Sequence, residues 1–343
     1  MNNDTRVKFN AYKQQIATLN GVSNAAEKFN VSPTVQQTLE TKIQEKSSFL
    51  KQISVEGVKE QTGDKVGIGV DGLIASTTDT DAGDRETRDP TTLDKDGYFC
   101  SQTNFDTHMR YKTLDAWAGR PDFQTRVRDS IIQRSALDRI CVGFNGTRRA
   151  ATSNKAANPL GQDVNIGWLE KIRQFAPEQH VFEVASGSGV IKVGKKVLGA
   201  DGFKNLDAVI FAATNDILAP WYQEDTRLVA ITGRKLLADK YFPIVNQSQP
   251  NTEALAADMI ISQKRIGNLP AVRVPFFPAD AVLVIPLYLL SLYWQIGARR
   301  RAIIDNPKRD RIENYESSND AYVIEDYQGA VLIENIRLEP EEE

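Results

Sequence analysis

Histidine and cysteine are scarce in this sequence, with two residues of each among 343. Cys100 and Cys141 form no Cys-x-x-Cys motif, so no disulfide framework is predicted, and we expect both to be buried reduced thiols. Neither His108 nor His180 has a second histidine at helical spacing, so a metal site or a catalytic base would rest on one isolated histidine. We expect His108 to be a structural residue on a strand and His180 to be solvated in a loop.

Long hydrophobic runs are also absent. The most apolar stretch, residues 282–294, contains Pro286 and is too short to cross a bilayer, so it is typical of core strands. The first residues lack the apolar segment of a signal peptide. The net charge of −3 provides no basic field that would draw the whole molecule onto nucleic acid. We therefore expect no membrane partner and no sequence-specific DNA recognition.

Signatures of catalysis and cofactor binding are missing or out of context. No Walker A sequence and no Gly-x-Ser-x-Gly elbow occur, and residues 186–189 are expected to form a turn. Residues 67–72 match Gly-x-Gly-x-x-Gly, but no helix is predicted after them, which favours a glycine-rich strand entering a hairpin. The adjacent carboxylates at 224–225 and 325–326 are expected to be solvated. The sequence thus predicts no catalytic residue, no cofactor and no metal.

The first 53 residues are predicted to form two amphipathic helices. In the first, apolar residues recur at steps of three and four from Phe9 onward, and Gly21 ends the pattern. Ser32 and Pro33 suit the N-cap and first turn of the second helix. Residues 22–31 show no period and are expected to be an exposed joint. The two helices could pack on the main domain as a hairpin or dock on another chain as an arm, and the pattern favours neither.

Residues 76–96 are the most polar segment, and only Ala82 and Leu93 within it are apolar. Segments with the residue pattern of strands flank it at 65–74 and 98–105. A segment this polar cannot bury itself in its own domain. Connections longer than about 12–15 residues are usually lids, binding loops or spacers. We therefore expect this segment to reach outward from the body.

The remaining pattern mixes helices and strands without a strict strand–helix–strand rhythm, which predicts an α+β fold. The clearest helix covers residues 121–144, where apolar residues recur at steps of three and four. A closing hairpin is expected from 322–327 and 329–337. The other expected helices are at 206–219, at 234–245 and a short one from 168, and the other expected strands are at 181–193, 228–232, 282–285 and 290–295.

One basic cluster is present, at residues 299–301 with Lys308, Arg309 and Arg311 nearby. Acidic residues are interleaved with it, whereas DNA recognition favours a more uniform basic stripe with aromatic residues. We expect this cluster to be a salt-bridged face between subunits.

Several segments resemble the major capsid proteins of P2-like tailed bacteriophages, in the same order along nearly the whole chain. The densest resemblance lies at residues 256–275. The other segments are 9–12 (Phe-Asn-Ala-Tyr), 67–69, 74–80, 110–115, 220–225, 237–246 and 311–317. The resemblance implies the HK97-type capsid fold, an α+β architecture with an N-terminal arm, an extended E-loop hairpin, a P domain with a long spine helix, and an A domain.

The resemblance also implies a division of the chain. The expected parts are an N-terminal helical arm at 1–60, the E-loop hairpin at 61–115, the P domain at 116–204 with its spine helix at 121–144, the A domain at 205–315, and a C-terminal hairpin at 316–343 that returns to the P domain and ends in an acidic tail. In this family an internal scaffold protein carrying a protease trims the N-terminus during maturation. By resemblance, the cut would fall near Phe29 and Asn30.

The resulting hypothesis is a structural protein, not an enzyme, made in the bacterial cytoplasm and found in the virion head. Copies of the chain would assemble as hexamers and pentamers into an icosahedral shell around double-stranded DNA. Its other expected partners are the internal scaffold protease, the portal protein and the packaged DNA, bound without sequence specificity. Two alternatives stay open at this point. One is a soluble α+β enzyme in which residues 76–96 form a lid, and the other is a scaffold or adaptor that binds a capsid without forming it.

Overall fold

A computed structural model describes residues 1–65, 69–70, 75–87, 91–92, 97–120, 122–197, 202–237 and 265–339. Two expectations lie wholly or largely outside these residues, namely the glycine-rich strand at 67–72 and the helix at 234–245. Residues 256–264, the first part of the segment of densest resemblance, also lie outside the described ranges.

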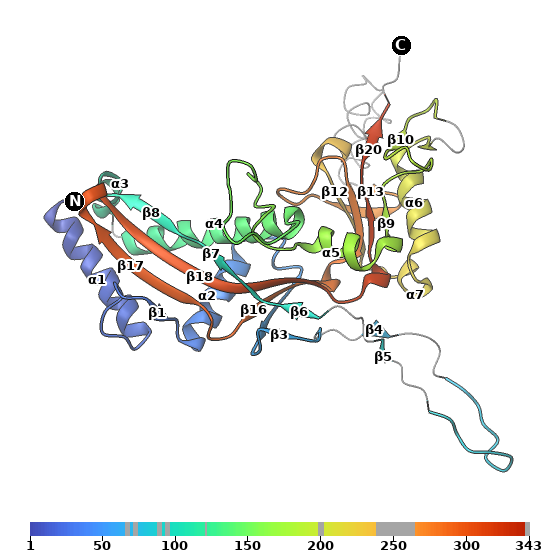
Figure 1. The fold of residues 1–343 in the computed structure, drawn as a ribbon, viewed down its shortest axis with the longest axis horizontal. Coiled ribbons are helices and arrows are strands. Elements are labelled where there is room, and N and C mark those ends of the chain that lie inside the picture. The colour runs from blue at the N-terminus through green and yellow to red at the C-terminus, as the bar shows by residue number, and fades with distance from the viewer. Residues whose placement is uncertain are drawn as a thin grey trace, which may run out of the picture.

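The larger of two main sheets runs along the length of the molecule (Figure 1). Its strands are β1 (Phe29–Asn30), β2 (Ser54–Val58), β7 (Ser101–Asn104), β8 (Thr107–Arg110), β16 (Leu290–Gln295), β17 (Arg300–Asn306) and β18 (Arg311–Ile324). Their order is β1–β17–β18–β16–β2, and β7 and β8 also pair with β18. The 14-residue β18 is therefore the axis of this sheet, since it pairs antiparallel with four other strands.

A second sheet stands at one end of the first (Figure 1). Its order is β13–β14–β12–β15–β19–β9, and a smaller sheet of order β11–β10–β20 accompanies it. These strands are β9 (His180–Val181), β10 (Ile191–Val193), β11 (Gly202–Phe203), β12 (Leu228–Thr232), β13 (Arg265–Ile266), β14 (Leu269–Val272), β15 (Val282–Pro286), β19 (Val331–Ile333) and β20 (Ile336–Leu338). β15 is buried at all five positions, as expected for the centre of a sheet covered on both faces.

Helices cover both sheets. They are α1 (Asn3–Leu19), α2 (Pro33–Glu45), α3 (Tyr111–Ala118), α4 (Phe123–Asn145), α5 (Trp168–Phe175), α6 (Leu206–Ile217) and α7 (Pro220–Gln223), with 3₁₀ turns at Pro177–Gln179, Leu287–Leu289, Pro307–Arg309 and Tyr327–Gly329. Figure 1 shows α4 running alongside the long strands of the larger sheet, and α6 and α7 beside the second sheet.

A separate hairpin leaves the larger sheet between β2 and β7. Its paired pieces are β3 (Thr62–Gly63) with β6 (Tyr98–Phe99), and β4 (Gly69–Val70) with β5 (Thr91–Thr92), all antiparallel. The described residues 75–87 at its far end are exposed throughout. Figure 1 shows this segment standing away from the body, so the expectation that the polar segment reaches outward is confirmed for these residues.

The main hydrophobic core lies where α4 and α5 meet the sheets, and Trp168 is its centre. The Trp168 side chain is fully buried, and its Nε1 donates to the carbonyl oxygen of Ser291 at 2.9 Å. Its ring packs edge-on against the rings of Phe144 and Tyr322, with centroids 5.1 Å away in each case. The short helix α5 is thereby fixed to both the spine helix α4 and the axial strand β18.

Most of the predicted elements are confirmed, and the fold is α+β. The helix expected at 121–144 is α4, the two N-terminal helices are α1 and α2, and the expected strands at 228–232, 282–285 and 290–295 are β12, β15 and β16. Residues 186–189 form the expected turn, in which Gly187 and Gly189 have positive φ.

Two expectations were wrong. Residues 22–31 are not an exposed joint, because Ala25, Phe29 and Val31 are buried and Phe29 pairs with Arg301 in the sheet. The closing hairpin does not exist either, since β19 pairs with β15 and β9, and β20 pairs with β10. The division expected after residue 315 also falls inside β18, a continuous strand.

Gly143 in α4 makes the close approach of Trp168 possible. A Cβ at this position would lie 2.2 Å from the indole ring. We predict that Gly143→Ala lowers the free energy of unfolding of the unassembled chain by about 2 kcal/mol or more, as overpacking of a core does, measured by urea titration. The control is Gly119→Ala at the C-cap of α3, where nothing lies within 4 Å and the backbone has helical angles (φ −68°, ψ −11°). Equal effects of the two substitutions would contradict this account of the core.

Candidate assembly surfaces

A buried network of ion pairs connects the N-terminal segment to the body. Arg139 of α4 donates two hydrogen bonds to Asp320 of β18, both at 3.0 Å, and also bonds to Glu40 of α2. Glu40 accepts in turn from Arg299, which lies just before β17 and also donates to Glu316 of β18. These five side chains are 1–3% exposed.

The network keeps its groups ionised despite their burial. Burial alone would raise the pKa of the Glu40 carboxyl, but Arg139 and Arg299 more than offset this and the pKa is lowered. Burial likewise opposes ionisation of Glu316, and Arg299 and Arg301 lower its pKa to about 2. The pKa of Arg139 is raised by its carboxylate partners against the effect of burial. A charge with all of its partners in place is tolerated inside a protein, whereas one left unpaired is costly.

This network corrects the expectation of a basic face between subunits. Arg299 is inside the molecule, and the Arg301 side chain is 15% exposed and donates to Asn314 and Tyr12. Arg300, Lys308 and Arg309 are exposed. The sequence offered one overlooked signal, since Arg139 lies three residues after buried Ala136 and beside buried Ile140, on the apolar side of α4.

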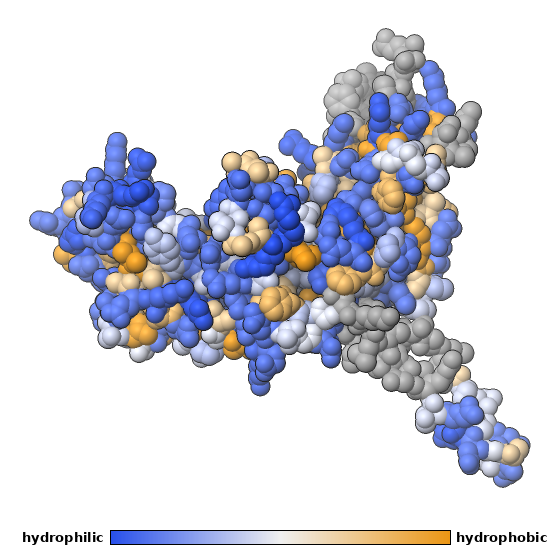
Figure 2. Space-filling view, viewed as in Figure 1, coloured by the Kyte–Doolittle hydropathy of each residue, from blue (hydrophilic) through white to orange (hydrophobic). Residues whose placement is uncertain are grey.

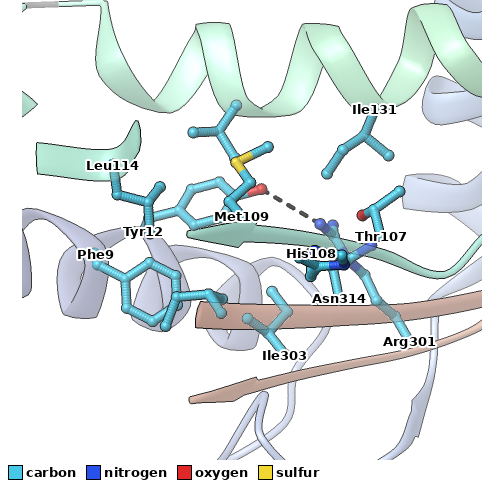
Figure 3. Close-up of a pocket in the computed structure, with 12 residues that line it drawn as sticks. Phe9, Tyr12, Thr107, His108, Met109, Leu114, Ile131, Arg301, Ile303 and Asn314 are labelled. Carbon is cyan, nitrogen blue, oxygen red and sulfur yellow. Dashed lines mark hydrogen bonds between the residues drawn. The ribbon is translucent and has the colours of Figure 1, made fainter. Parts of the chain in front are cut away.

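Helix α1 docks on the far end of the larger sheet. Figure 3 shows Phe9 and Tyr12 of α1 facing Leu114 and Ile303, with the Tyr12 hydroxyl bonded to Arg301 at 3.3 Å. Arg6 pairs with Asp305 at the edge of this contact, where the two side chains are 47% and 31% exposed. Of the two open possibilities, the packing of these helices on their own chain is therefore the one that the structure shows.

The residues expected near a maturation cut, Phe29 and Asn30, form the whole of β1. β1 pairs with β17 at the edge of the sheet, and the next amide, that of Val31, donates to the carbonyl oxygen of Arg299 at 2.9 Å. Phe29 is buried and Asn30 is exposed. The segment is thus extended and held by few backbone contacts.

The hairpin keeps one register between its two paired pieces. Gly63 pairs with Tyr98 and Gly69 with Thr92, so the same number of positions separates the two pairs along both arms. The turn at the tip fits the same register, because the amide of Ala82 donates to the carbonyl oxygen of Asp79 at 3.1 Å. The described surface of this tip is mostly hydrophilic (Figure 2).

The remaining singled-out residues have structural partners. His180 is not solvated as expected, because its side chain is 15% exposed and its Nε2 lies 2.9 Å from Glu334. Burial would raise the pKa of Glu334, but hydrogen bonds from Arg173 and His180 lower it to about 2. Both cysteines are free and buried, as expected, and burial raises the pKa of Cys100 to about 12 and of Cys141 to about 11.

The two adjacent carboxylate pairs were expected to be solvated, which is wrong for three of their four members, since these bond to other side chains. Asp225 pairs with Arg227, whereas Glu224 is exposed. Glu325 accepts from the hydroxyl of Tyr293 at 2.7 Å, and Asp326 accepts from that of Tyr222 at 2.9 Å. Among the described residues, no group of three or more potential metal ligands comes together, and no helix is long and apolar enough to span a bilayer.

Comparison with known proteins identifies the kind of protein to which this architecture belongs. The family model described as "Phage major capsid protein, P2 family" matches residues 8–336. The chain belongs to this family. It is 53% identical to the "Capsid proteins" of Escherichia phage P2, with 98% of this chain and 96% of that one covered, and 40% identical to the "Major capsid protein" of Serratia phage KSP20, with 98% and 97% covered.

A solved structure supports the same conclusion for the fold. A chain of the satellite phage P4 procapsid, determined with the size determination (Sid) protein, matches with a TM-score of 0.82 at 50% identity, over 99% of both chains. The expected HK97-type capsid fold is therefore confirmed. The protein is a structural major capsid protein that assembles with copies of itself into the shell of the phage head, and it is not an enzyme. The enzyme and adaptor alternatives are thereby rejected.

The buried network gives a prediction about stability. We expect Glu40→Gln to lower the free energy of unfolding by about 3–5 kcal/mol, because it leaves two buried guanidinium groups without a shared carboxylate. The control is Asp138→Asn, which breaks the exposed ion pair with Arg134 and should cost less than about 1 kcal/mol. Urea titration of the unassembled chains measures both, and a Glu40→Gln loss as small as that of the control would show that the network is not a stabilising connection.

Proposed function

We propose that this capsid protein builds an icosahedral head from hexamers and pentamers, around an internal scaffold that carries a protease, with a portal protein at one vertex and double-stranded DNA inside. The observation that carries the proposal is the exposed polar hairpin tip at residues 75–87 on a chain of the major capsid family. A segment with so little apolar surface gains order by lying against another molecule rather than in its own core.

Assembly would depend on many modest contacts rather than on one strong interface. The hairpin of one copy would lie over a neighbour and add polar and backbone contacts to it. Contacts that are weak singly become stable when each copy makes several of them, since the later ones form within an already connected shell. The net charge of −3 suits a shell that encloses DNA without binding its phosphates tightly.

The division of the chain into parts is part of this proposal. Residues 1–60 would be the N-terminal arm and 61–115 the E-loop hairpin, with β7 and β8 at its base. The larger sheet and α4 would form the P domain, and the second sheet with α6 would form the A domain. Because β18 is continuous from Arg311 to Ile324, this assignment follows the two sheets instead of the boundary at residue 315.

We further propose that maturation removes the first part of the arm by a cut between Phe29 and Asn30. The two halves of the arm are held differently, which supports a cut between them. Helix α1 is held by an apolar face and by exposed polar contacts such as Arg6 with Asp305. Helix α2 is held by the buried Glu40 and by Gln36, which is fully buried and exchanges hydrogen bonds with Gln295 and Gly297. The first half can leave without opening the ion-pair network, and the second cannot.

Electron microscopy of the overexpressed chain tests the shell function. We predict closed shells or tubes from the unaltered protein. Deletion of residues 78–94 should leave a folded monomer that forms no closed shell, because the described part of this segment, residues 78–87, is exposed throughout. Folding of the deleted chain is checked by circular dichroism and thermal melting. Normal shells from the deleted chain would refute the proposed role of the hairpin.

Mass spectrometry of subunits tests the proposed cut. In particles made by coexpression with the scaffold protease, we predict that the subunit mass corresponds to residues 30–343. A matched preparation without the protease should yield the full chain. A subunit that keeps residues 1–29 in protease-containing particles, or one that is cut inside α2, would overturn this assignment.

A further inference from the structure

The tip of the hairpin is strongly acidic. Residues 75–87 contain four carboxylates, at Asp79, Asp81, Asp84 and Glu86, and one cation, Arg85. All thirteen positions are exposed. We call this segment the acidic tip. Its side chains carry about the same net charge as the whole chain, so the rest of the molecule is close to neutral and the excess charge is concentrated at the end of a projecting limb.

One described loop carries exposed charge of the opposite sign. Residues 146–167, which we call the basic loop, follow the C-terminal end of α4 and expose Arg148, Arg149 and Lys155. Its single acidic residue, Asp163, is 3% exposed and accepts hydrogen bonds from the amide of Asn154 at 2.7 Å and from the side chain of Asn158. The exposed charge of the basic loop is therefore entirely positive.

The arginines of the basic loop are positioned but not neutralised. Arg149 donates to the carbonyl oxygens of Val164 at 3.0 Å and Gln102 at 2.7 Å, and Arg148 contacts the side-chain oxygen of Asn158 at 3.4 Å. Carbonyl and amide oxygens hold a guanidinium group in place without cancelling its charge. A carboxylate from outside would still gain a charge-assisted hydrogen bond there.

A cavity of about 420 Å³ lies beside this loop, at the foot of the hairpin. Arg149 lines it together with Thr62, Gly97 and Phe99 of the hairpin's own base. The Phe99 side chain is 58% exposed. The site thus offers positive charge and one apolar contact, which suits a short polar turn that carries carboxylates and a small residue such as Ala82.

The geometry of the hairpin decides which copy can occupy the site. The cavity includes the base of the hairpin, whereas the tip lies at its other end. Figure 1 shows the tip standing away from the body. A tip that stands away from its own body does not contact its own foot, so a tip that binds there must come from another molecule.

We propose that the acidic tip of one copy docks on the basic loop and the adjoining cavity of a neighbouring copy. This inference rests on the proposed shell assembly and specifies one of its contacts. Opposite charge on the two surfaces favours the correct register and opposes contact between two tips or two basic loops. Because the two surfaces differ, each copy donates one tip and receives another, and the contact can continue from subunit to subunit.

A charge-swap experiment tests the docking. The tip variant carries Asp81→Lys, Asp84→Lys and Glu86→Lys, and it keeps Asp79 because that carboxylate accepts from the amide of Asp81 within the turn. The loop variant carries Arg148→Glu and Lys155→Glu, and it keeps Arg149 because of its two carbonyl contacts. Each variant alone should lose about tenfold or more of the yield of closed particles, and the chain with both sets of changes should recover it.

The control is Lys308→Glu with Arg309→Glu, a reversal of the exposed cations at the turn between β17 and β18. It should not restore assembly of the tip variant. Thermal melting of each unassembled variant checks its folding, and a loop variant that melts early is replaced by Arg148→Gln with Lys155→Gln, which should still reduce particle yield.

Several results would overturn the docking while leaving the shell function intact, provided that the unaltered chain forms shells. These are normal assembly of either single variant, a combined variant without recovery, and recovery by the control reversal. A loop variant that forms normal empty shells but fails only to retain DNA would show that the basic loop faces the genome instead. If the unaltered chain forms no shells, the proposed function itself fails.

Discussion

The buried ion-pair network around Glu40 is the constraint on which the rest of the structure depends. Its five charges come from α2, from α4, from the residue just before β17, and from β18. Each guanidinium serves two carboxylates and both share Glu40, so removal of any one segment would deprive a buried charge of one of its partners. The arrangement therefore forms as a whole, and it holds the second half of the N-terminal arm against the spine helix and the axial strand.

The ion-pair network divides the chain into a rigid body and segments that are available to contact other subunits. The rigid body includes the larger sheet, α4 and α2, and the Trp168 core continues it toward the second sheet. The hairpin tip shares no buried contact with it, and α1 is attached by a face whose ion pair is partly exposed. A shell subunit needs both properties, because a rigid body fixes the angles between subunits and projecting segments bind the neighbouring copies.

The sequence alone predicted those features that depend on local periodicity. The repeat of apolar residues identified α4, expected at 121–144 and observed at Phe123–Asn145, and Ser32 with Pro33 identified the start of α2. The extreme polarity of residues 76–96 predicted an outward segment, which is confirmed for the described residues 76–87. These signals are local, so a single pass along the chain detects them.

The features that were missed depend on contacts between distant segments. Pairing of β19 with β15 cannot be read from either strand, and proximity in sequence wrongly favoured a hairpin with the preceding strand. Arg139 was overlooked and Arg299 was assigned to a face between subunits, because a buried charge is recognisable only when its partners are known. Phe29 and Val31 did show the two-residue spacing of a strand, but β1 is too short for that pattern to stand out.

The distribution of charge explains how such a subunit could form a closed shell instead of a dimer. A contact between identical surfaces is satisfied once two copies meet, whereas a contact between two different surfaces always leaves one of each available. An acidic limb and a basic loop on the same chain are surfaces of the second kind. Because exposed charge pairs are individually weak and are screened by salt, a wrongly placed copy can dissociate before the shell closes around it. The same weakness would be a defect in a dimer, but in a shell it permits correction during growth, and the number of contacts supplies the final stability.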